Sequence, residues 1–382
     1  MAFYLMVGIP YGIINLWIVW WFWRALRGAG AIQMLICLGI VALALCFPLV
    51  YKRPENSDFM VALVRLGSVW VGMFIYFFLL ILLLDAWNLV GRIMGRLPVE
   101  GPRYGLCFLL ILTVGGACVA GWLNAAKPVV REYSLVLKTK EPALLADGGK
   151  TLTLAVLGDM HLGRIITAER FSRAIDLLVP YKPDAVFFLG DTLDDHFLLD
   201  RAAMGAAVDR LEAPLGVWGI VGNHEYISGP IGESITILED LGINVLCDEW
   251  TNLGGVLLVA GRDDYSRSGF LASERKSLPE ILRGVPEATH SIPLLVLDHQ
   301  PRNLEEAEAA GAVLQLSGHT HNGQLWPFNH VVSALYENAR GLSTRGNTHY
   351  IVTVGAGTWG PPLRTNARPE VLVLRVSFAP AE

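Results

Sequence analysis

The sequence predicts two structural parts, an N-terminal region of four transmembrane helices and a C-terminal α/β domain. Of the 382 residues, 53% are hydrophobic and only 17% are charged, which is too apolar for an ordinary soluble protein. The long apolar runs lie almost entirely before Lys127, whereas short β-rich runs alternate with helical segments after it, as they do in layered α/β domains. We therefore expect a transmembrane region at 1–126, a connector at 127–150 and the α/β domain at 151–382.

Four apolar segments are long enough to cross a bilayer, which requires about 20 residues. They are Phe3–Trp23, Ala31–Tyr51, Leu66–Val90 and Leu106–Ala126. Asp85 is the one acidic residue inside the third segment. Its place near the end of that segment favours a position at the membrane interface over a role in an ion path.

The loops between these segments carry similar positive charge on the two sides of the membrane. When the interhelical loops and the segment after the fourth helix are counted together, five basic residues lie on each side of the membrane. The positive-inside rule therefore does not decide the orientation. The interhelical loops alone place five against three, which favours both termini and the α/β domain outside the cytoplasm. The residues counted are Arg24, Arg27, Arg92, Arg96 and Arg103 on one side, and Lys52, Arg53, Arg65, Lys127 and Arg131 on the other.

The domain after the connector has an alternating pattern of strands and helices. Its net charge offers no basic patch, since the whole chain carries −5, and we expect no nucleic-acid partner. Thr167 is a candidate N-cap for the first helix. The expected strands are Thr151–Leu157, Asp184–Leu189, Leu215–Val221, Val256–Ala260, Pro293–Leu297, Ala312–Leu316, Tyr350–Val354 and Val371–Val376, and the expected helices are Ala168–Val179 and Leu199–Leu211.

Polar clusters rich in metal-binding side chains follow five of the expected strands. Side chains at i and i+2 of an extended segment point the same way, so an Asp-x-His or His-x-His pair can address one cation. Carboxylate, imidazole and amide ligands together suit Mn²⁺, Fe²⁺ or Zn²⁺. Each cluster alone is a weak signal, but five in succession predict a metal site at the strand ends. The clusters are Asp159-Met160-His161, Gly190-Asp191-Thr192-Leu193-Asp194, Gly222-Asn223-His224-Glu225, Asp298-His299 and Gly318-His319-Thr320-His321.

These clusters resemble, in order, the motifs D-x-H, GDxxD, GNH(E/D), a single His and GHxH of the calcineurin-like metallophosphoesterase superfamily. The resemblance covers residues 150–376 and implies a central β-sandwich flanked by helices. The segments 298–301, 318–327 and 355–360 resemble the membrane-associated YkuE/YaeI-type branch, which implies a bacterial-type inner or cell membrane. Asn322 stands where that branch usually has glycine.

The resemblance also implies a set of seven metal ligands. It places Asp159, His161 and His321 on one metal ion and Asn223, His299 and His319 on the other, with Asp191 bridging the two. We expect two divalent ions, Mn²⁺ in the first place and Fe²⁺, Zn²⁺ or Mg²⁺ as alternatives. Two such ions about 3.5–4 Å apart can share a hydroxide that attacks phosphorus in line.

Two residues resemble the catalytic pair of the family. His224 matches the histidine that contacts the phosphate or protonates the leaving oxygen, and Asp194 would orient it. The alternative for Asp194 is a turn cap. Glu225 and Asp195 are expected to be solvated neighbours, and His196 a surface histidine.

Three further residues are candidates for binding the substrate. Arg364 and Arg164 could clamp a phosphate, because a guanidinium matches its geometry, with surface salt bridges as the alternative. Trp326, together with Phe328 and Trp359, could line an apolar approach to the site, with core packing as the alternative.

The expected activity is phosphoester hydrolysis, as a phosphodiesterase or pyrophosphatase, by a membrane-anchored enzyme. Four helices suggest a site held near the bilayer and a lipid-linked substrate, such as UDP-2,3-diacylglucosamine or a related glycolipid pyrophosphate, which relatives in the superfamily hydrolyse. Alternatives are a phosphatase or phosphodiesterase for soluble nucleotides or phosphoproteins, and a non-catalytic regulatory module. The presence of all seven ligands and of His224 argues against the last alternative.

Overall fold

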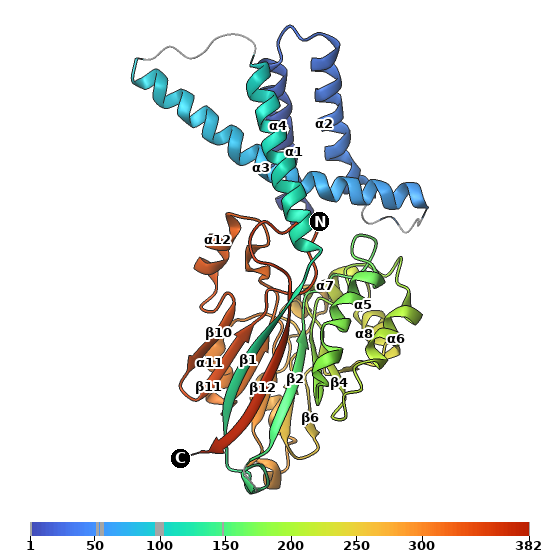
Figure 1. Cartoon of the computed structure of the whole chain (residues 1–382), viewed down its shortest axis with the longest axis vertical. Coiled ribbons are helices and arrows are strands. Elements are labelled where there is room, and N and C mark those ends of the chain that lie inside the picture. Colours follow the sequence, from blue (N-terminus) through green and yellow to red (C-terminus); the bar gives the residue numbers. More distant parts are fainter. Residues whose placement is uncertain (1, 51–52, 54–56, 96–102, 147–148, 382) are drawn as a thin grey trace. The chain divides into compact units, whose positions relative to one another are not determined.

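The computed structural model describes residues 2–50, 53, 57–95, 103–146 and 149–381, with side chains from residue 8 onward. The chain forms two compact units (Figure 1). The helical unit comprises Met1–Leu123 and Gly360–Leu363, and the α/β unit comprises Asn124–Trp359 and Arg364–Glu382. Of the positions named in the sequence analysis, Tyr51, Lys52 and Arg96 lie outside the described residues, as do residues 147–148 of the expected connector and the last residue, Glu382.

Each of the four predicted apolar segments coincides with a helix over its described residues, apart from Ala126, which lies in a turn. Of the helices in the described part of the chain, α2, α3 and α4 are long and apolar enough to cross a membrane. The helix α1 is not among them, so three helices able to cross a membrane are supported and not the four that the sequence predicts. The bounds are α1 Ala2–Ala25, α2 Ala31–Val50, α3 Asp58–Ile93 and α4 Tyr104–Ala125.

The helix α3 is longer than the sequence pattern predicts. It has 36 residues, or about 54 Å at 1.5 Å per residue, which exceeds the hydrocarbon core of about 30 Å. Ser57 caps its start by accepting a hydrogen bond from the Met60 amide. Asp85 lies eight residues before its last residue, Ile93, and is partly exposed.

The α/β unit contains two mixed sheets of six strands each. The first has the order β1-β12-β2-β3-β4-β5 and the second the order β10-β11-β9-β8-β7-β6. Strands β2 to β5 are parallel, as are β7, β8, β9 and β11. The strands are β1 Val129–Thr139, β2 Thr151–Leu157, β3 Ala185–Leu189, β4 Val217–Ile220, β5 Asn244–Val245, β6 Glu249–Leu253, β7 Leu257–Gly261, β8 Leu294–Leu297, β9 Leu314–Ser317, β10 Gly341–Arg345, β11 Thr348–Val352 and β12 Glu370–Pro380.

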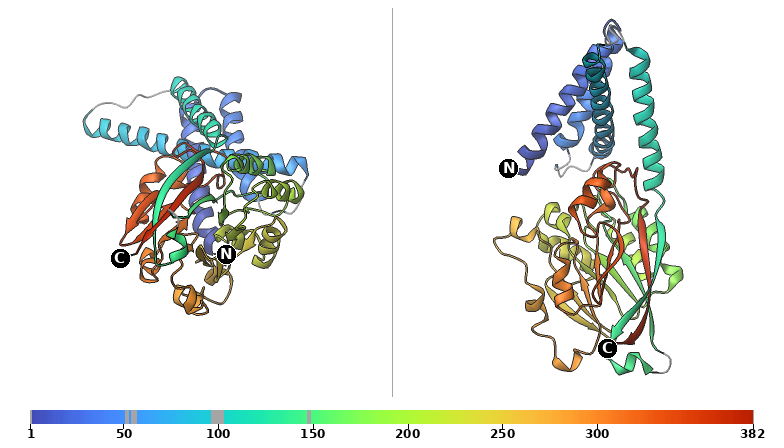
Figure 2. Two further views of the ribbon diagram at one scale, coloured as in Figure 1. Left: turned by 60° about the horizontal axis from the view of Figure 1, so that its bottom comes forward. Right: turned by 90° about the vertical axis from the view of Figure 1, so that its left-hand side faces the viewer.

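The two sheets pack face to face and helices cover their outer faces (Figures 1 and 2). Leu154 and Val156 face the second sheet, whereas Ala155 and Leu157 face the helices, as the two-residue period of a strand requires. The predicted β-sandwich flanked by helices is therefore present. The helices are α5 Ala168–Asp176, α6 Arg201–Asp209, α7 Asn223–Ser228, α8 Ile231–Asp240, α9 Arg267–Phe270, α10 Leu278–Leu282, α11 Leu304–Ala309 and α12 Phe328–Leu335, with short 3₁₀ turns at Pro142–Leu144, Val179–Tyr181, Glu287–Thr289 and His321–Gly323.

The segment expected to be a connector contributes a strand to the first sheet. All eleven residues of β1 pair with β12 in parallel, and only residues 126–128 lie between the end of α4 and the start of β1. Leu135 and Leu137 point into the core between the sheets, whereas Arg131 and Glu132 are exposed. The polar outer face of this edge strand is what made the segment resemble a linker. Thr167 does precede α5, but its side chain makes no cap hydrogen bond.

Candidate metal centre

The predicted ligands lie on tight loops that follow the strands. Asp159 and His161 have φ angles of 51° and 53°, and His319 and His321 have 69° and 45°. These values lie in the left-handed region, which side chains other than glycine rarely adopt and which is typical of functional sites. The extended geometry assumed in the sequence analysis is therefore wrong. The side chains converge because the backbone coils beneath them.

One group of ligands consists of Asp159, His161 and His321, all buried. The Nε2 atoms of His161 and His321 lie 2.9 Å apart, and the His321 Nε2 lies 3.9 Å from Asp159 Oδ1. The other oxygen, Asp159 Oδ2, is buried and has no hydrogen-bond partner among the described residues. Three potential ligand atoms thus surround one point.

A second group combines Asn223 with Asp191, His299 and His319. The Asn223 Oδ1 lies 2.8 Å from His319 Nδ1 and 3.2 Å from His299 Nε2. Asp191 Oδ2 lies 3.2 Å from His299 Nε2 and 3.8 Å from His161 Nε2 of the first group. The Asp191 carboxylate therefore stands between the two groups.

Neighbouring backbone groups orient these side chains. Leu189 O lies 2.7 Å from His299 Nδ1, so Nδ1 carries the proton of the neutral imidazole. The lone pair on Nε2 is then available to a metal ion. Asp191 Oδ1 accepts the His224 amide at 2.8 Å, which turns Oδ2 toward the histidines. Orientation of ligands by such outer hydrogen bonds is typical of metal sites.

The electrostatics of the two groups fit a pair of divalent cations. Burial raises the pKa of Asp159 to about 7, and burial together with the neighbouring His299 lowers the pKa of His319 to about 3. Buried carboxylates and imidazoles crowded in this way are stabilised by cations that replace protons. The unpartnered Asp159 Oδ2 and the mixed nitrogen and oxygen donors suit Mn²⁺, Fe²⁺ or Zn²⁺.

Beside the ligands, His224 and Asp194 form a close pair. The His224 Nδ1 lies 2.6 Å from Asp194 Oδ1, and both side chains are buried. Burial opposes protonation of His224, but the negative charges of Asp191 and Asp194 outweigh it and raise its pKa to about 9. Asp194 Oδ1 also lies 3.6 Å from His161 Nδ1. The imidazole is therefore held protonated next to the ligand groups.

Two positions on the ligand loops require particular backbones. A Cβ atom at Gly318 would lie 2.6 Å from Asp159 Oδ2, so only glycine lets this loop approach the carboxylate. Asn322 has a φ of 47°, a conformation that asparagine adopts more readily than most residues. Asparagine therefore fits the backbone of this loop.

Glu225 and Asp195 are buried, which corrects the expectation that both are solvated. Glu225 accepts hydrogen bonds from the amides of Asp191 and Leu193 at 2.9 Å and of Gly222 at 2.7 Å. It thereby joins the loop after β3 to the loop after β4. The sequence offered one signal for this role. A glutamate at the third position of a helix often accepts a hydrogen bond from the backbone amide of the residue that immediately precedes the helix.

The two candidate phosphate clamps are both buried, so neither makes the surface salt bridge considered as the alternative. Arg164 pairs with Asp195, with Nε 3.2 Å from Oδ2. Arg364 donates hydrogen bonds to the backbone carbonyls of three residues. Its Nη2 atom also lies 3.1 Å from His321 Nδ1. It thus supports the backbone behind a ligand. The three carbonyls belong to Val354, Gly355 and Gly357.

The aromatic residues near the motifs are exposed, so core packing is the wrong interpretation for Trp326, Phe328 and Trp359. The Trp359 ring centroid lies 6.0 Å from that of His224. His196, by contrast, is partly exposed, and its Nε2 atom lies 3.0 Å from Ser234 Oγ.

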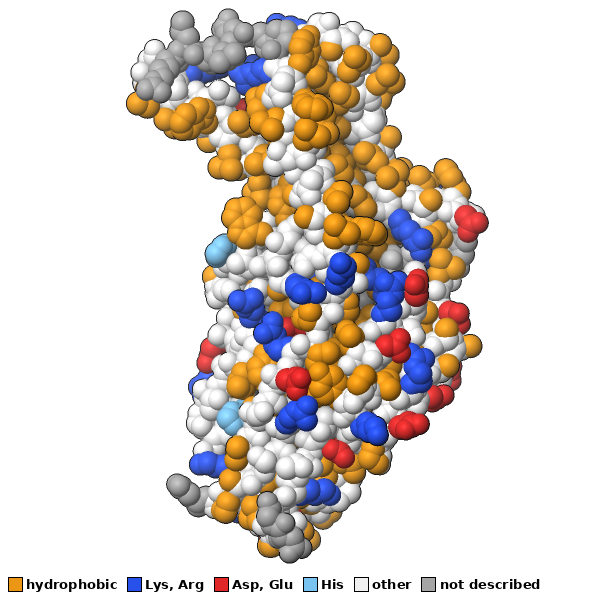
Figure 3. Space-filling model, in the orientation of Figure 1, with side chains coloured by type: hydrophobic (Ala, Val, Ile, Leu, Met, Phe, Trp, Pro, Cys, Tyr) orange, Lys and Arg blue, Asp and Glu red, His pale blue; other side chains and the backbone are white. Residues whose placement is uncertain are grey.

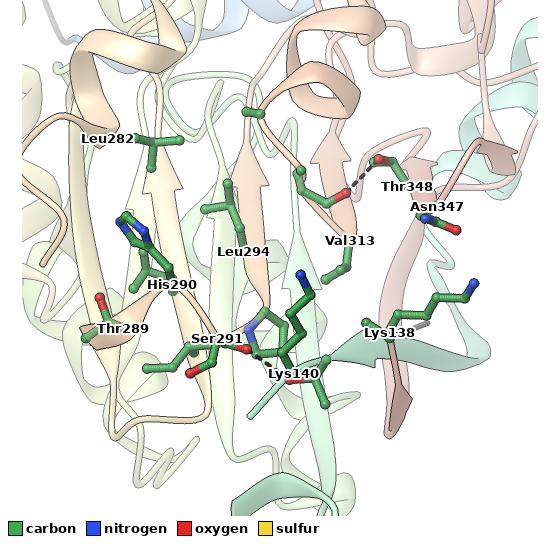
Figure 4. Close-up of a pocket in the computed structure, with 18 of the residues that line it drawn as sticks. Lys138, Lys140, Leu282, Thr289, His290, Ser291, Leu294, Val313, Asn347 and Thr348 are labelled. Atoms are coloured by element: carbon green, nitrogen blue, oxygen red, sulfur yellow. Dashed lines mark hydrogen bonds between the residues drawn. The ribbon is translucent and has the colours of Figure 1, made fainter. Parts of the chain in front are cut away.

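A separate hollow of about 930 Å³ lies elsewhere in the α/β unit (Figure 4). Leu294 at the start of β8 and Val313 just before β9 line it, together with Lys138, Lys140 and His290. The candidate ligands His299 and His319 follow the opposite ends of the same strands. The hollow is therefore not part of the metal centre.

Comparison with known proteins agrees with this geometry. Residues 152–323 match the family model described as calcineurin-like phosphoesterase. The chain is 30% identical over 253 residues to an uncharacterized metallophosphoesterase of Helicobacter pylori, over 66% of this chain and 64% of that protein. It is 30% identical over 247 residues to the phosphodiesterase YaeI of Escherichia coli, over 61% of this chain and 85% of that protein.

A third relative is the transmembrane protein with metallophosphoesterase domain of Bos taurus, which is 26% identical over 309 residues, covering 77% of this chain and 67% of that protein. The chain spans 64% of the length of the Helicobacter pylori relative. The resemblance predicted from the five motifs is confirmed. The chain belongs to the calcineurin-like phosphoesterase family.

Proposed function

We propose that this protein is a two-metal phosphoester hydrolase that its N-terminal helices anchor in a membrane. The observation that carries the proposal is the placement of Asp191 Oδ2 within 3.2 Å of His299 Nε2 and 3.8 Å of His161 Nε2. One carboxylate oxygen can thus serve both ligand groups. Family membership and the name of the Escherichia coli relative support phosphodiester hydrolysis.

In this proposal seven side chains hold two divalent ions. Asp159, His161 and His321 hold one ion and Asn223, His299 and His319 hold the other, with Asp191 shared, and Mn²⁺ is the ion we expect first. Two bound ions would supply Lewis acidity toward the phosphoryl oxygens and a nucleophilic water at neutral pH.

The other steps fall to residues of the chain itself. Asp194 accepts a hydrogen bond from the Nδ1–H of His224. The Nε2–H of His224 is then free to donate to a phosphoryl oxygen or to the leaving oxygen. The hydrogen bond and the negative charge of Asp194 favour the protonated imidazole, which a general acid requires. Glu225 and Arg364 would maintain the loops that carry the ligands.

We further propose that the substrate is a lipid-linked phosphodiester or pyrophosphate, such as UDP-2,3-diacylglucosamine or a related glycolipid. Three helices able to cross a membrane and the transmembrane relative from Bos taurus support a membrane location. Placement of the α/β unit outside the cytoplasm rests on the five-to-three distribution of basic residues in the interhelical loops.

The test is hydrolysis by the full-length protein in detergent micelles after metal removal and after addition of Mn²⁺. Bis-p-nitrophenyl phosphate reports the reaction class, and UDP-2,3-diacylglucosamine is compared with soluble nucleotide diesters and a phosphoprotein. We expect Mn²⁺-dependent turnover of the chromogenic diester that His224→Ala lowers roughly 10²–10⁴-fold. Absence of any metal-dependent turnover refutes the enzymatic assignment, and turnover of soluble substrates alone refutes the lipid assignment.

A further inference from the structure

The helix α12, Phe328–Leu335, directs an apolar face to the outside of the α/β unit. None of its eight residues is buried. Phe328, Val331 and Leu335 occupy positions i, i+3 and i+7, which share one side of a helix. Val331 is 53% exposed and Leu335 is 72% exposed. A helix of a soluble domain normally turns such a face inward.

Two exposed tryptophans lie on segments connected to this helix. Trp326 is 55% exposed and Trp359 is 56% exposed. Gln324 connects the two segments, because its side chain accepts a hydrogen bond from the Trp359 amide and donates one to the Trp359 carbonyl, each at 2.8 Å. We call the five exposed side chains the α12 patch: Trp326, Phe328, Val331, Leu335 and Trp359.

The patch adjoins the candidate metal centre. The 3₁₀ turn His321–Gly323, which begins with a metal ligand, leads into the patch with only four residues before α12. On the other side, the Trp359 ring lies 6.0 Å from the ring of His224. A molecule that covers the patch would therefore lie next to the site where phosphate chemistry is proposed.

We infer that the α12 patch inserts into the interfacial layer of the lipid bilayer and presents a lipid-borne phosphate to the metal centre. The inference rests on the proposed function and specifies how its substrate reaches the site. Short helices with one apolar face and flanking tryptophans favour the membrane interface, where tryptophan is enriched.

Three features of this chain favour a bilayer as the occupant. Three of its helices are long and apolar enough to cross one. Only residues 126–128 separate α4 from β1, so a short segment joins the α/β unit to a helix able to cross a membrane. Trp359 is followed directly by Gly360–Leu363, a segment that belongs to the compact helical unit. The apolar surface of that unit contrasts with the many charged side chains on the α/β unit (Figure 3).

Spin labelling in lipid vesicles tests the insertion. The full-length protein, with its native cysteines replaced by alanine and its turnover of bis-p-nitrophenyl phosphate verified, is labelled with a nitroxide at Val331→Cys or at Val136→Cys. Val136 is a matched control, since it is also a valine and is 57% exposed on β1. The vesicles contain phosphatidylethanolamine and phosphatidylglycerol.

We expect the label at Val331 to collide mainly with oxygen, which concentrates in lipid, and the label at Val136 to collide mainly with a water-soluble nickel chelate. The ratio of the two collision rates should differ several-fold between the positions. Equal exposure to the nickel chelate at both positions overturns the inference. Dipolar broadening at Val331 also overturns it, because a second copy of the chain would then cover the patch.

Turnover separates this inference from the proposed function. The double substitution Val331→Gln with Leu335→Gln should lower hydrolysis of UDP-2,3-diacylglucosamine in vesicles at least several-fold and leave that of bis-p-nitrophenyl phosphate unchanged, whereas Val136→Gln should alter neither. Unchanged lipid turnover in the double variant refutes delivery of substrate by the patch. If the wild type cleaves no lipid substrate while Val331 lies in lipid, the proposed substrate fails and the insertion stands.

Discussion

Replacing Glu225 with glutamine is expected to loosen the metal centre without removing a ligand. The carboxylate accepts three backbone amides, two on Oε2 from Asp191 and Gly222 and one on Oε1 from Leu193. A glutamine has one acceptor oxygen. If that oxygen takes the place of Oε2, the amide NH₂ group faces the Leu193 N–H and one hydrogen bond is lost.

The size of the effect follows from these contacts. A hydrogen bond to a charged group contributes about 1.5–3 kcal/mol, and the two that remain weaken because their acceptor becomes neutral. A neutral side chain also relieves the burial penalty and the repulsion by Asp191 that raise the pKa of Glu225. We therefore expect a loss of about 2 kcal/mol in the free energy of unfolding of the α/β unit, or a decrease of about 4–8 °C in Tm.

Thermal unfolding of the detergent-solubilised protein, with and without Mn²⁺, measures this loss. Glu239→Gln is the matched control, because Glu239 is exposed on α8. The Mn²⁺ affinity of Glu225→Gln should also fall, since the loops bearing Asp191 and Asn223 are no longer tied together. If Glu225→Gln unfolds and binds Mn²⁺ like the control, the proposed role of this carboxylate is wrong.

Three further predictions address the site. His224→Ala should lower kcat for bis-p-nitrophenyl phosphate roughly 10²–10⁴-fold with Mn²⁺ binding retained, and equal loss in the control His196→Ala would contradict its role as general acid. Mn²⁺ affinity should fall roughly tenfold per pH unit below the Asp159 pKa of about 7, because the ion must displace a proton, and calorimetry showing no proton release would exclude this. Arg364→Met should lower the free energy of unfolding by about 2 kcal/mol or more, because three backbone carbonyls lose their donor, whereas the exposed Arg283→Met should melt like wild type.

Much of the fold was predictable because buried parallel strands have a strong local signal. The strand Thr151–Leu157 has the predicted bounds, and the strands that end in the ligand clusters were all placed to within two residues. The missed strands β1, β5, β6 and β10 are short or lie near sheet edges, where half of each strand is solvated and polar. Their pairing is decided by partners distant in the sequence.

The site was predictable in its residues but not in its geometry. The five motifs identified the side chains that the fold brings together, yet the left-handed backbone at Asp159 and His319 contradicts the extended geometry assumed for them. Nor did the sequence reveal that Glu225 is buried and joins two loops. Such contacts depend on loops separated by about thirty residues, whose approach only the packed sheets determine.

By itself, the sequence determined the apolar N-terminal helices, the α/β class and the set of candidate metal-binding side chains, because each leaves a local pattern of composition or spacing. Only the tertiary structure decided that Arg364 supports His321 from behind, that Glu225 braces the ligand loops and that α12 turns its apolar face outward. Burial and orientation depend on what a residue packs against, and the contacting residues are distant in the sequence, so the local sequence pattern does not reveal them.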